Sequence, residues 1–100
     1  MKEKRHLHEA IILTPSDWEK FRKNFESIHP QFYIRLHDRF PDLTPAEIRL
    51  ATLIKLRFST KKMAGTLGIS PQSIIKTRYR MKKKLDLGKD INLDQEITQI

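Results

Sequence analysis

Apolar residues recur along the chain at helical spacing, and proline or glycine separates the successive apolar stripes. A helix brings residues at i, i+3, i+4 and i+7 to one face, which can then be buried. Between residues 14 and 85 several such stripes follow one another with short polar breaks, and no alternating strand pattern competes with them. The pattern predicts an all-α fold of five helices, with a sixth, short helix near the C-terminal end.

The first two stripes predict a pair of helices within residues 14–42. Ser16 and Glu19 form a capping-box pattern, in which each side chain caps a backbone amide of the other's turn. Pro30 and Pro41 end the two helices, because the residue before a proline avoids helical geometry. The pair is expected to bury these apolar residues: Trp18, Phe21, Phe25 and Ile28 from the first helix, and Phe32, Leu36 and Phe40 from the second.

A second capping-box pattern marks the start of a more apolar helix. Thr44 and Glu47 can cap each other, and Pro45 stands at the first helical position, where its missing N–H has no cost. This helix is expected to run to about Arg57. Its predicted buried side consists of Leu50, Ala51, Leu53 and Ile54.

Two more helices are predicted between residues 59 and 85. Ser59 or Thr60 caps a short first helix, and Ser70 followed by Pro71 begins the second, which runs to about Leu85. The first of these helices carries the apolar residues Met63, Ala64 and Leu67. After the break Asp86-Leu87-Gly88, Asn92 can cap the short sixth helix, with Leu93, Ile97 and Ile100 on one stripe.

Three residues in this region have the spacing of a helix-turn-helix. Crossing helices need a small residue at their contact, and Ala64 supplies it. The turn needs a residue that tolerates positive φ, and Gly68 supplies it, while Ile74 provides the apolar contact of the second helix. In a helix-turn-helix the second helix enters the major groove of DNA.

Positive charge is concentrated in the same region. The chain has a net charge of +8, and residues 59–89 hold nine Lys or Arg residues but only one acid, Asp86. A basic field confined to one segment indicates a polyanionic partner, either nucleic acid or acidic lipid.

The predicted last long helix has two different faces. Ile74, Met81 and Leu85 fall on the side that packs inward, whereas the opposite side presents Gln72, Ile75, Lys76, Tyr79 and Lys83. Gln can read adenine, Lys can read guanine, and Ile75 can contact a thymine methyl group. Arg80, Lys82 and Lys84 lie nearer the flanks, where phosphates would be.

Other kinds of function find little support. The chain has no cysteine, which excludes disulfides and thiolate metal sites, and no apolar run approaches the roughly 18 residues that span a bilayer. No Gly-rich phosphate loop or acid–base constellation is present, so no enzymatic activity, cofactor or metal site is expected. His6 and His8 are interpreted as part of a charged tail, and His29 and His37 have no catalytic partner pattern.

The motifs, taken in order, resemble a known family. The residues Leu43-Thr44-Pro45-x-Glu47, Ser59-Thr60-Lys61-x-Met63-Ala64-x-x-Leu67-Gly68-Ile69-Ser70-Pro71-x-Ser73-Ile74 and Lys84-Leu85 are similar to the LuxR/GerE-type helix-turn-helix domain. The upstream elements Trp18-x-x-Phe21 and His29-Pro30-x-Phe32, together with the basic run 78–85, resemble a narrower set. These are the C-terminal output domains of Bacteroidetes regulators, in which a larger sensor precedes the domain.

The resemblance implies transcription regulation by sequence-specific binding to double-stranded DNA. Its base-reading positions fall on Ile75, Lys76 and Tyr79, beside Gln72. Its phosphate-contacting positions, with the neighbouring cations, fall on Thr60, Lys61, Lys62, Ser70, Ser73, Arg80, Lys82 and Lys83. It further implies a LuxR/GerE-like bundle without a winged helix, a cytoplasmic location at the nucleoid and, more weakly, a homodimer on DNA.

Two positions depart from the family pattern. Arg57 stands where the family usually has glycine, which leaves the end of the preceding helix open. Lys62 stands where the family usually has an acid, and it adds positive charge close to a helix start that faces phosphate.

Three alternative functions remain open at this point. A σ-factor region-4-like module also combines a helix-turn-helix with a basic terminal helix. A basic membrane-surface helix would share the charge of residues 71–85. A protein-docking helical module is the third, and the concentrated charge argues against it.

The chain is thus expected to have four parts. Residues 1–13 form a connector, 14–42 an N-terminal helical pair, 43–88 the helix-turn-helix domain, and 89–100 a tail or short helix.

Overall fold

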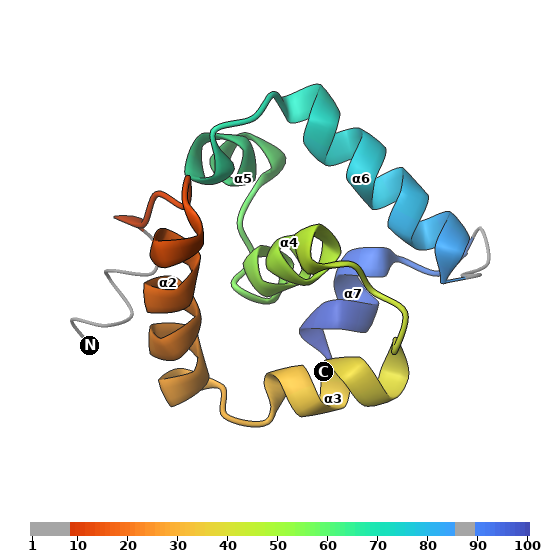
Figure 1. The fold of residues 1–100 in the computed structure, drawn as a ribbon. Helices are drawn as coiled ribbons and strands as arrows, with labels where there is room; N and C mark the ends of the chain where they lie inside the picture. The colour runs from red at the N-terminus through yellow and green to blue at the C-terminus, as the bar shows by residue number, and fades with distance from the viewer. Residues whose placement is uncertain (1–8, 86–89) are drawn as a thin grey trace.

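A computed structural model describes residues 9–85 and 90–100, and these form six helices without a strand (Figure 1). The helices are α2 (Pro15–Ile28), α3 (Phe32–Arg39), α4 (Pro45–Lys55), α5 (Thr60–Leu67), α6 (Pro71–Lys84) and α7 (Leu93–Thr98). In Figure 1, α4 lies in the middle, with α2, α3, α5 and α6 around it, and α7 packs against α4. The all-α prediction is confirmed. None of the helices within the described ranges is long and apolar enough to cross a membrane.

Helix α2 begins two residues earlier than the sequence pattern predicted. Thr14, not Ser16, is the N-cap: its hydroxyl accepts the amide N–H of Asp17 at 3.1 Å. The Asp17 carboxylate in turn accepts the amides of Leu13 at 3.0 Å and Thr14 at 3.1 Å, which together lower its pKa. Pro15 occupies the first helical position, so Thr14-Pro15 starts this helix as Thr44-Pro45 and Ser70-Pro71 start two others.

The core agrees with the predicted apolar stripes, apart from the edges of α2. Trp18 is half-buried and Ile28 is exposed, whereas the other stripe residues named for α2 and α3 are buried. Helix α4 contributes the largest share, with Leu50, Ala51, Leu53 and Ile54 among its buried residues. The Tyr33 hydroxyl is paired within the core, where it lies 2.8 Å from the Thr52 hydroxyl.

Helix α4 ends at Lys55, before the predicted Arg57, because the chain turns through a left-handed residue. Arg57 has φ +64°, and its amide donates to the Ile54 carbonyl at 2.8 Å. The next amide, of Phe58, donates to the Leu53 carbonyl at 3.1 Å. These two hydrogen bonds form a Schellman motif, in which the left-handed position usually carries glycine. Arg57 therefore occupies a backbone position where a side chain is unfavourable.

Residues 9–13, which were expected to be a connector, lie beside α5 and contact its C-terminal end through Ile12 and Leu13. Ile12 is buried, and its amide donates to the Thr66 carbonyl at 2.7 Å. The Leu13 side chain covers Gly68 so closely that a Cβ at Gly68 would lie 2.5 Å from Leu13 Cδ2. Residues 1–8, with His6 and His8, and the predicted break at Asp86-Leu87-Gly88 lie outside the described residues.

The C-terminal segment closes the opposite side of the core. Asn92 caps α7 as predicted, and Leu93 and Ile97 are buried. Lys55 Nζ donates to the Thr98 carbonyl at 2.8 Å, and Arg39 of α3 forms an ion pair with Glu96. The short helix predicted here is thus present and is held by apolar and polar contacts.

Candidate nucleic-acid interface

The connection between α5 and α6 has the backbone that the three turn residues predicted. Gly68 is left-handed, with φ +66°, and the amide of Ile69 donates to the Ala64 carbonyl at 3.0 Å. The Ser70 hydroxyl then accepts the amide of Ser73 at 3.1 Å and so begins α6. Ala64 and Ile74 are both buried, so the two helices pack together through the predicted small and apolar residues.

The two faces of α6 differ as its periodicity predicted. Ile74 and Met81 are 1% and 0% exposed and anchor the inward face. The outward face carries five exposed residues: Gln72, Ile75, Lys76, Tyr79 and Lys83. Two of them are large and apolar, since Ile75 is 57% and Tyr79 67% exposed.

Two of the six cations between Lys76 and Lys84 have internal acidic partners. Arg78 forms an ion pair with Asp94 in the first turn of α7, and its other terminal nitrogen lies 3.9 Å from the sulfur of Met63. Lys84 donates to the Glu47 carboxylate at 2.9 Å, so it holds α6 against the start of α4. The expectation that Lys84 lies on a phosphate-facing flank is corrected, because its ammonium is used within the fold.

Glu47 connects the two helices through its charge. Burial favours the neutral form of this carboxyl, but the Lys84 ammonium and the Thr44 amide outweigh burial and hold its pKa below the ordinary value of 4.5. The predicted capping box is present as well, since Glu47 accepts the Thr44 amide at 2.8 Å. The partnership with Lys84 spans 37 residues and has no signal in the sequence.

The other four cations of this run are Lys76, Arg80, Lys82 and Lys83, and none has an acidic partner within residues 9–85 and 90–100. Lys76, Arg80 and Lys83 are exposed, and Lys82 is half-buried. At about 100° per residue, Arg80 and Lys82 lie on opposite flanks of the line that Gln72, Tyr79 and Lys83 form. The outward cations thus border the apolar pair on both sides.

The predicted phosphate contacts outside the basic run lie at the starts of the two helices. Lys61 and Lys62 are exposed in the first turn of α5, and Thr60 is half-buried. The hydroxyls of Ser70 and Ser73 lie 3.0 Å apart, so both serve the cap of α6. All of these residues belong to α5, α6 or their connection.

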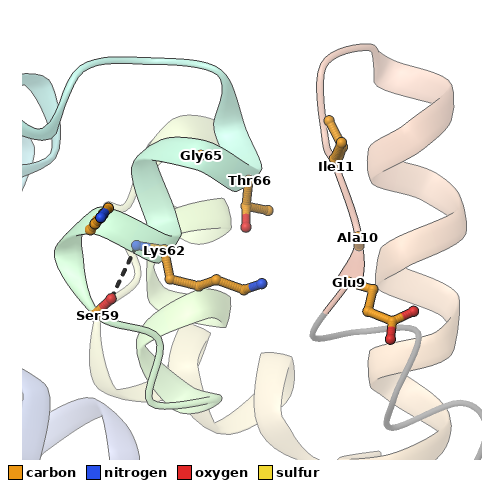
Figure 2. A pocket seen from close by; sticks show the side chains of 8 residues that line it. Glu9, Ala10, Ile11, Ser59, Lys62, Gly65 and Thr66 are labelled. Carbon is orange, nitrogen blue, oxygen red and sulfur yellow. Dashed lines mark hydrogen bonds between the residues drawn. The ribbon is translucent and has the colours of Figure 1, made fainter.

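Lys61 and Lys62 also border a pocket of 480 Å³ between α5 and residues 9–11. Figure 2 shows the Lys62 side chain extending into this space, with the Glu9 carboxylate on the opposite wall. Lys62 Nζ lies 5.7 Å from the centre of the Phe58 ring, which keeps the side chain close to the protein. Sequence reasoning gave no indication of this pocket, because it depends on how residues 9–11 lie beside α5.

The described residues include no group of three or more His, Asp or Glu side chains placed to bind a metal ion. The scan against protein-family models and the searches of curated proteins and of solved structures find no match to this chain.

Proposed function

We propose that the chain is a sequence-specific DNA-binding module of a bacterial transcriptional regulator, of the LuxR/GerE type that its motifs resemble. Helix α6 would lie in the major groove as the second helix of a helix-turn-helix. The observation that carries the proposal is the division of charge on α6. Arg78 and Lys84 are paired with acids of the fold, whereas the four outward cations lack an acidic partner in the described chain, and all of them except the half-buried Lys82 are exposed.

The outward face has the chemistry that base reading needs. Gln72 and Lys76 offer donors to purine edges, and Ile75 offers an apolar surface to a thymine methyl group. Tyr79 adds a phenol that can donate and accept. Lys83 and the flanking cations would neutralise phosphates, together with Lys61 and Lys62 at the start of α5. The same proposal includes a location at the nucleoid, binding to DNA as a homodimer and attachment to a sensor upstream.

The burial of the inward stripe favours DNA over a membrane surface. A membrane-binding helix inserts its apolar face into lipid. Ile74 and Met81, the apolar anchors of α6, are buried in the protein core and are not available to lipid. Ile75 and Tyr79 remain outside, and each stands between cations.

In vitro selection from a random duplex pool tests the proposal directly. We expect one recurring sequence, bound more tightly than random duplex, with affinity that falls steeply as salt rises. Equal binding to selected and random duplexes at moderate salt would remove the claim of sequence specificity. Retention of RNA polymerase core enzyme on the chain would favour the σ-like alternative, and co-sedimentation with anionic vesicles the membrane alternative.

Lys83→Gln separates the phosphate contacts from the base contacts. Removing one phosphate contact should weaken binding to all sequences alike and flatten the salt slope by about one unit. Lys23→Gln removes the same charge from an exposed position on α2 and serves as the matched control. The role assigned to Lys83 is wrong if both variants change the slope equally.

A further inference from the structure

A second surface lies on the inward flank of α6, away from the outward face. It is a groove of 430 Å³ between the segment that precedes α2, the first turns of α4 and the α5–α6 connection. Leu13 and Ile69, on its rim, are 64% and 43% exposed. From α6 the groove receives only Ile74 and Thr77, which do not belong to the proposed base-reading set. A ligand in this groove would therefore not compete with DNA for the outward residues.

Among the described residues that line the groove, Arg49 is the only charged one. Its guanidinium carbon lies 5.4 Å from the centre of the Trp18 ring, which holds the side chain against α2. Its Nε is buried without a hydrogen-bond partner, and no acid of the described chain pairs with this arginine. The positive charge of Arg49 is therefore unbalanced at the groove wall, and a carboxylate is the group that would pair with its guanidinium through a charge-assisted hydrogen bond.

We propose that this groove binds a partner protein through a short segment in which an acidic residue stands next to an apolar one. The apolar side chain would occupy the space beside Leu50 and Ile74, and the carboxylate would pair with Arg49. Charge argues against a second copy of this chain as the occupant. The chain has a net charge of +8, and Glu19, Glu26, Glu47, Asp94 and Glu96 are already in ion pairs. DNA fits poorly as well, because most of the groove wall is aliphatic.

Selection of peptides on the chain without DNA tests this proposal independently of the DNA-binding proposal. The probe is a displayed library of random twelve-residue peptides, and the enriched peptides are then synthesised and titrated by fluorescence anisotropy. We expect them to share an Asp or Glu within two residues of Leu, Ile, Met or Phe. Arg49→Gln should weaken their binding roughly tenfold or more, because it removes the charge-assisted contact.

Three comparisons keep this test decisive. Ile69→Glu places a negative charge on the exposed rim and should also weaken binding, even if Arg49→Gln alters the packing on Trp18. Lys23→Gln, a matched loss of one charge on α2, should leave peptide binding unchanged. Acidic peptides that associate instead with the basic outward face of α6 would bind more weakly to Lys83→Gln.

The proposal is overturned if no peptide is enriched or if the enriched peptides lack a carboxylate. It also fails if Arg49→Gln and Ile69→Glu bind as tightly as the native chain, or if Lys83→Gln weakens binding as much as Arg49→Gln. Dimerisation of the chain that is lost in Arg49→Gln would assign the groove to a second copy and overturn the proposed occupant.

Discussion

Helices α4 and α6 begin in the same way and serve opposite purposes. Each starts with a hydroxyl cap followed by proline, Thr44-Pro45 in one and Ser70-Pro71 in the other. Helix α4 then buries six of its 11 residues, whereas α6 buries two of its 14. Local capping therefore determines where each helix begins, but the residues after the cap determine whether it faces protein or solvent.

The difference extends to charge. Helix α4 carries few charges, and its Glu47 is paired across the fold with Lys84. Helix α6 uses two cations for internal pairs and presents the others outward. Helix α4 thus acts mainly through packing, and we expect α6 to act mainly through its outward residues. Four substitutions test this contrast, in order of decreasing effect.

The largest effect is expected in α4. Leu53 is fully buried, so Leu53→Ala should lower the free energy of unfolding by about 3 kcal/mol through lost burial and a residual cavity. Urea denaturation measures the change. Ile75→Ala, on the outward face of α6, is the control and should change stability by less than about 0.5 kcal/mol. Similar losses in both variants would abolish the contrast between the two helices.

Removing the ion pair between Glu47 of α4 and Lys84 of α6 should give the next largest loss of stability. Glu47→Gln removes the Lys84 ion pair and weakens the cap, at a cost of about 1–2 kcal/mol. Because the folded pKa of Glu47 lies below 4.5, its contribution is present above that pH and is lost as pH falls through the lower folded value.

Urea denaturation from neutral to acidic pH measures this contribution. The native chain and Glu47→Gln should converge in stability as the solution is acidified. Asp38→Asn, which removes an exposed carboxylate of α3, is the control and should change stability at neutral pH by less than about 0.5 kcal/mol. A constant gap between the native chain and Glu47→Gln at every pH would argue against the assigned charge interaction.

Ile75 tests whether the outward face of α6 contacts bases. If its side chain meets a thymine methyl group, Ile75→Ala should cost about 1 kcal/mol of binding to the selected duplex. Replacing the contacted thymine by uracil removes the methyl group from the DNA side of this contact. The replacement should therefore weaken DNA binding by the native chain but not by Ile75→Ala. Competition gel shifts on the four combinations measure this coupling. The methyl contact is refuted if the native chain binds the duplex equally well with uracil in place of each thymine.

The smallest effect is expected at the end of α4. Arg57 is left-handed, and glycine adopts this conformation more easily, so Arg57→Gly should raise stability by about 0.5–1 kcal/mol. Thermal denaturation measures the gain. Arg57→Ala removes the same charge but keeps Cβ, so a gain shared by both variants would point to charge rather than to backbone strain.

Local chemistry explains which features could be predicted from the sequence. The cap at Thr44, the left-handed Gly68 and the two faces of α6 depend on residues within a few positions of one another. The start of α2 was misjudged because two capping patterns overlap there, and the pattern of Thr14 with Pro15 and Asp17 prevails over that of Ser16 with Glu19.

Contacts between distant segments could not be predicted in the same way. Arg78 and Asp94 are 16 residues apart, and Glu47 and Lys84 are 37 apart. Their pairing depends on how the helices pack, so the sequence showed six similar cations where the structure distinguishes two kinds. The groove at Arg49 was missed for the same reason, because three separate segments form its walls.

The path of residues 9–13 has a mechanical consequence. The hydrogen bond from Ile12 to Thr66 and the cover of Leu13 over Gly68 join this segment to the end of α5. A force applied at residue 9 would therefore act on the end of α5 as well as on α2, which follows this segment directly along the chain.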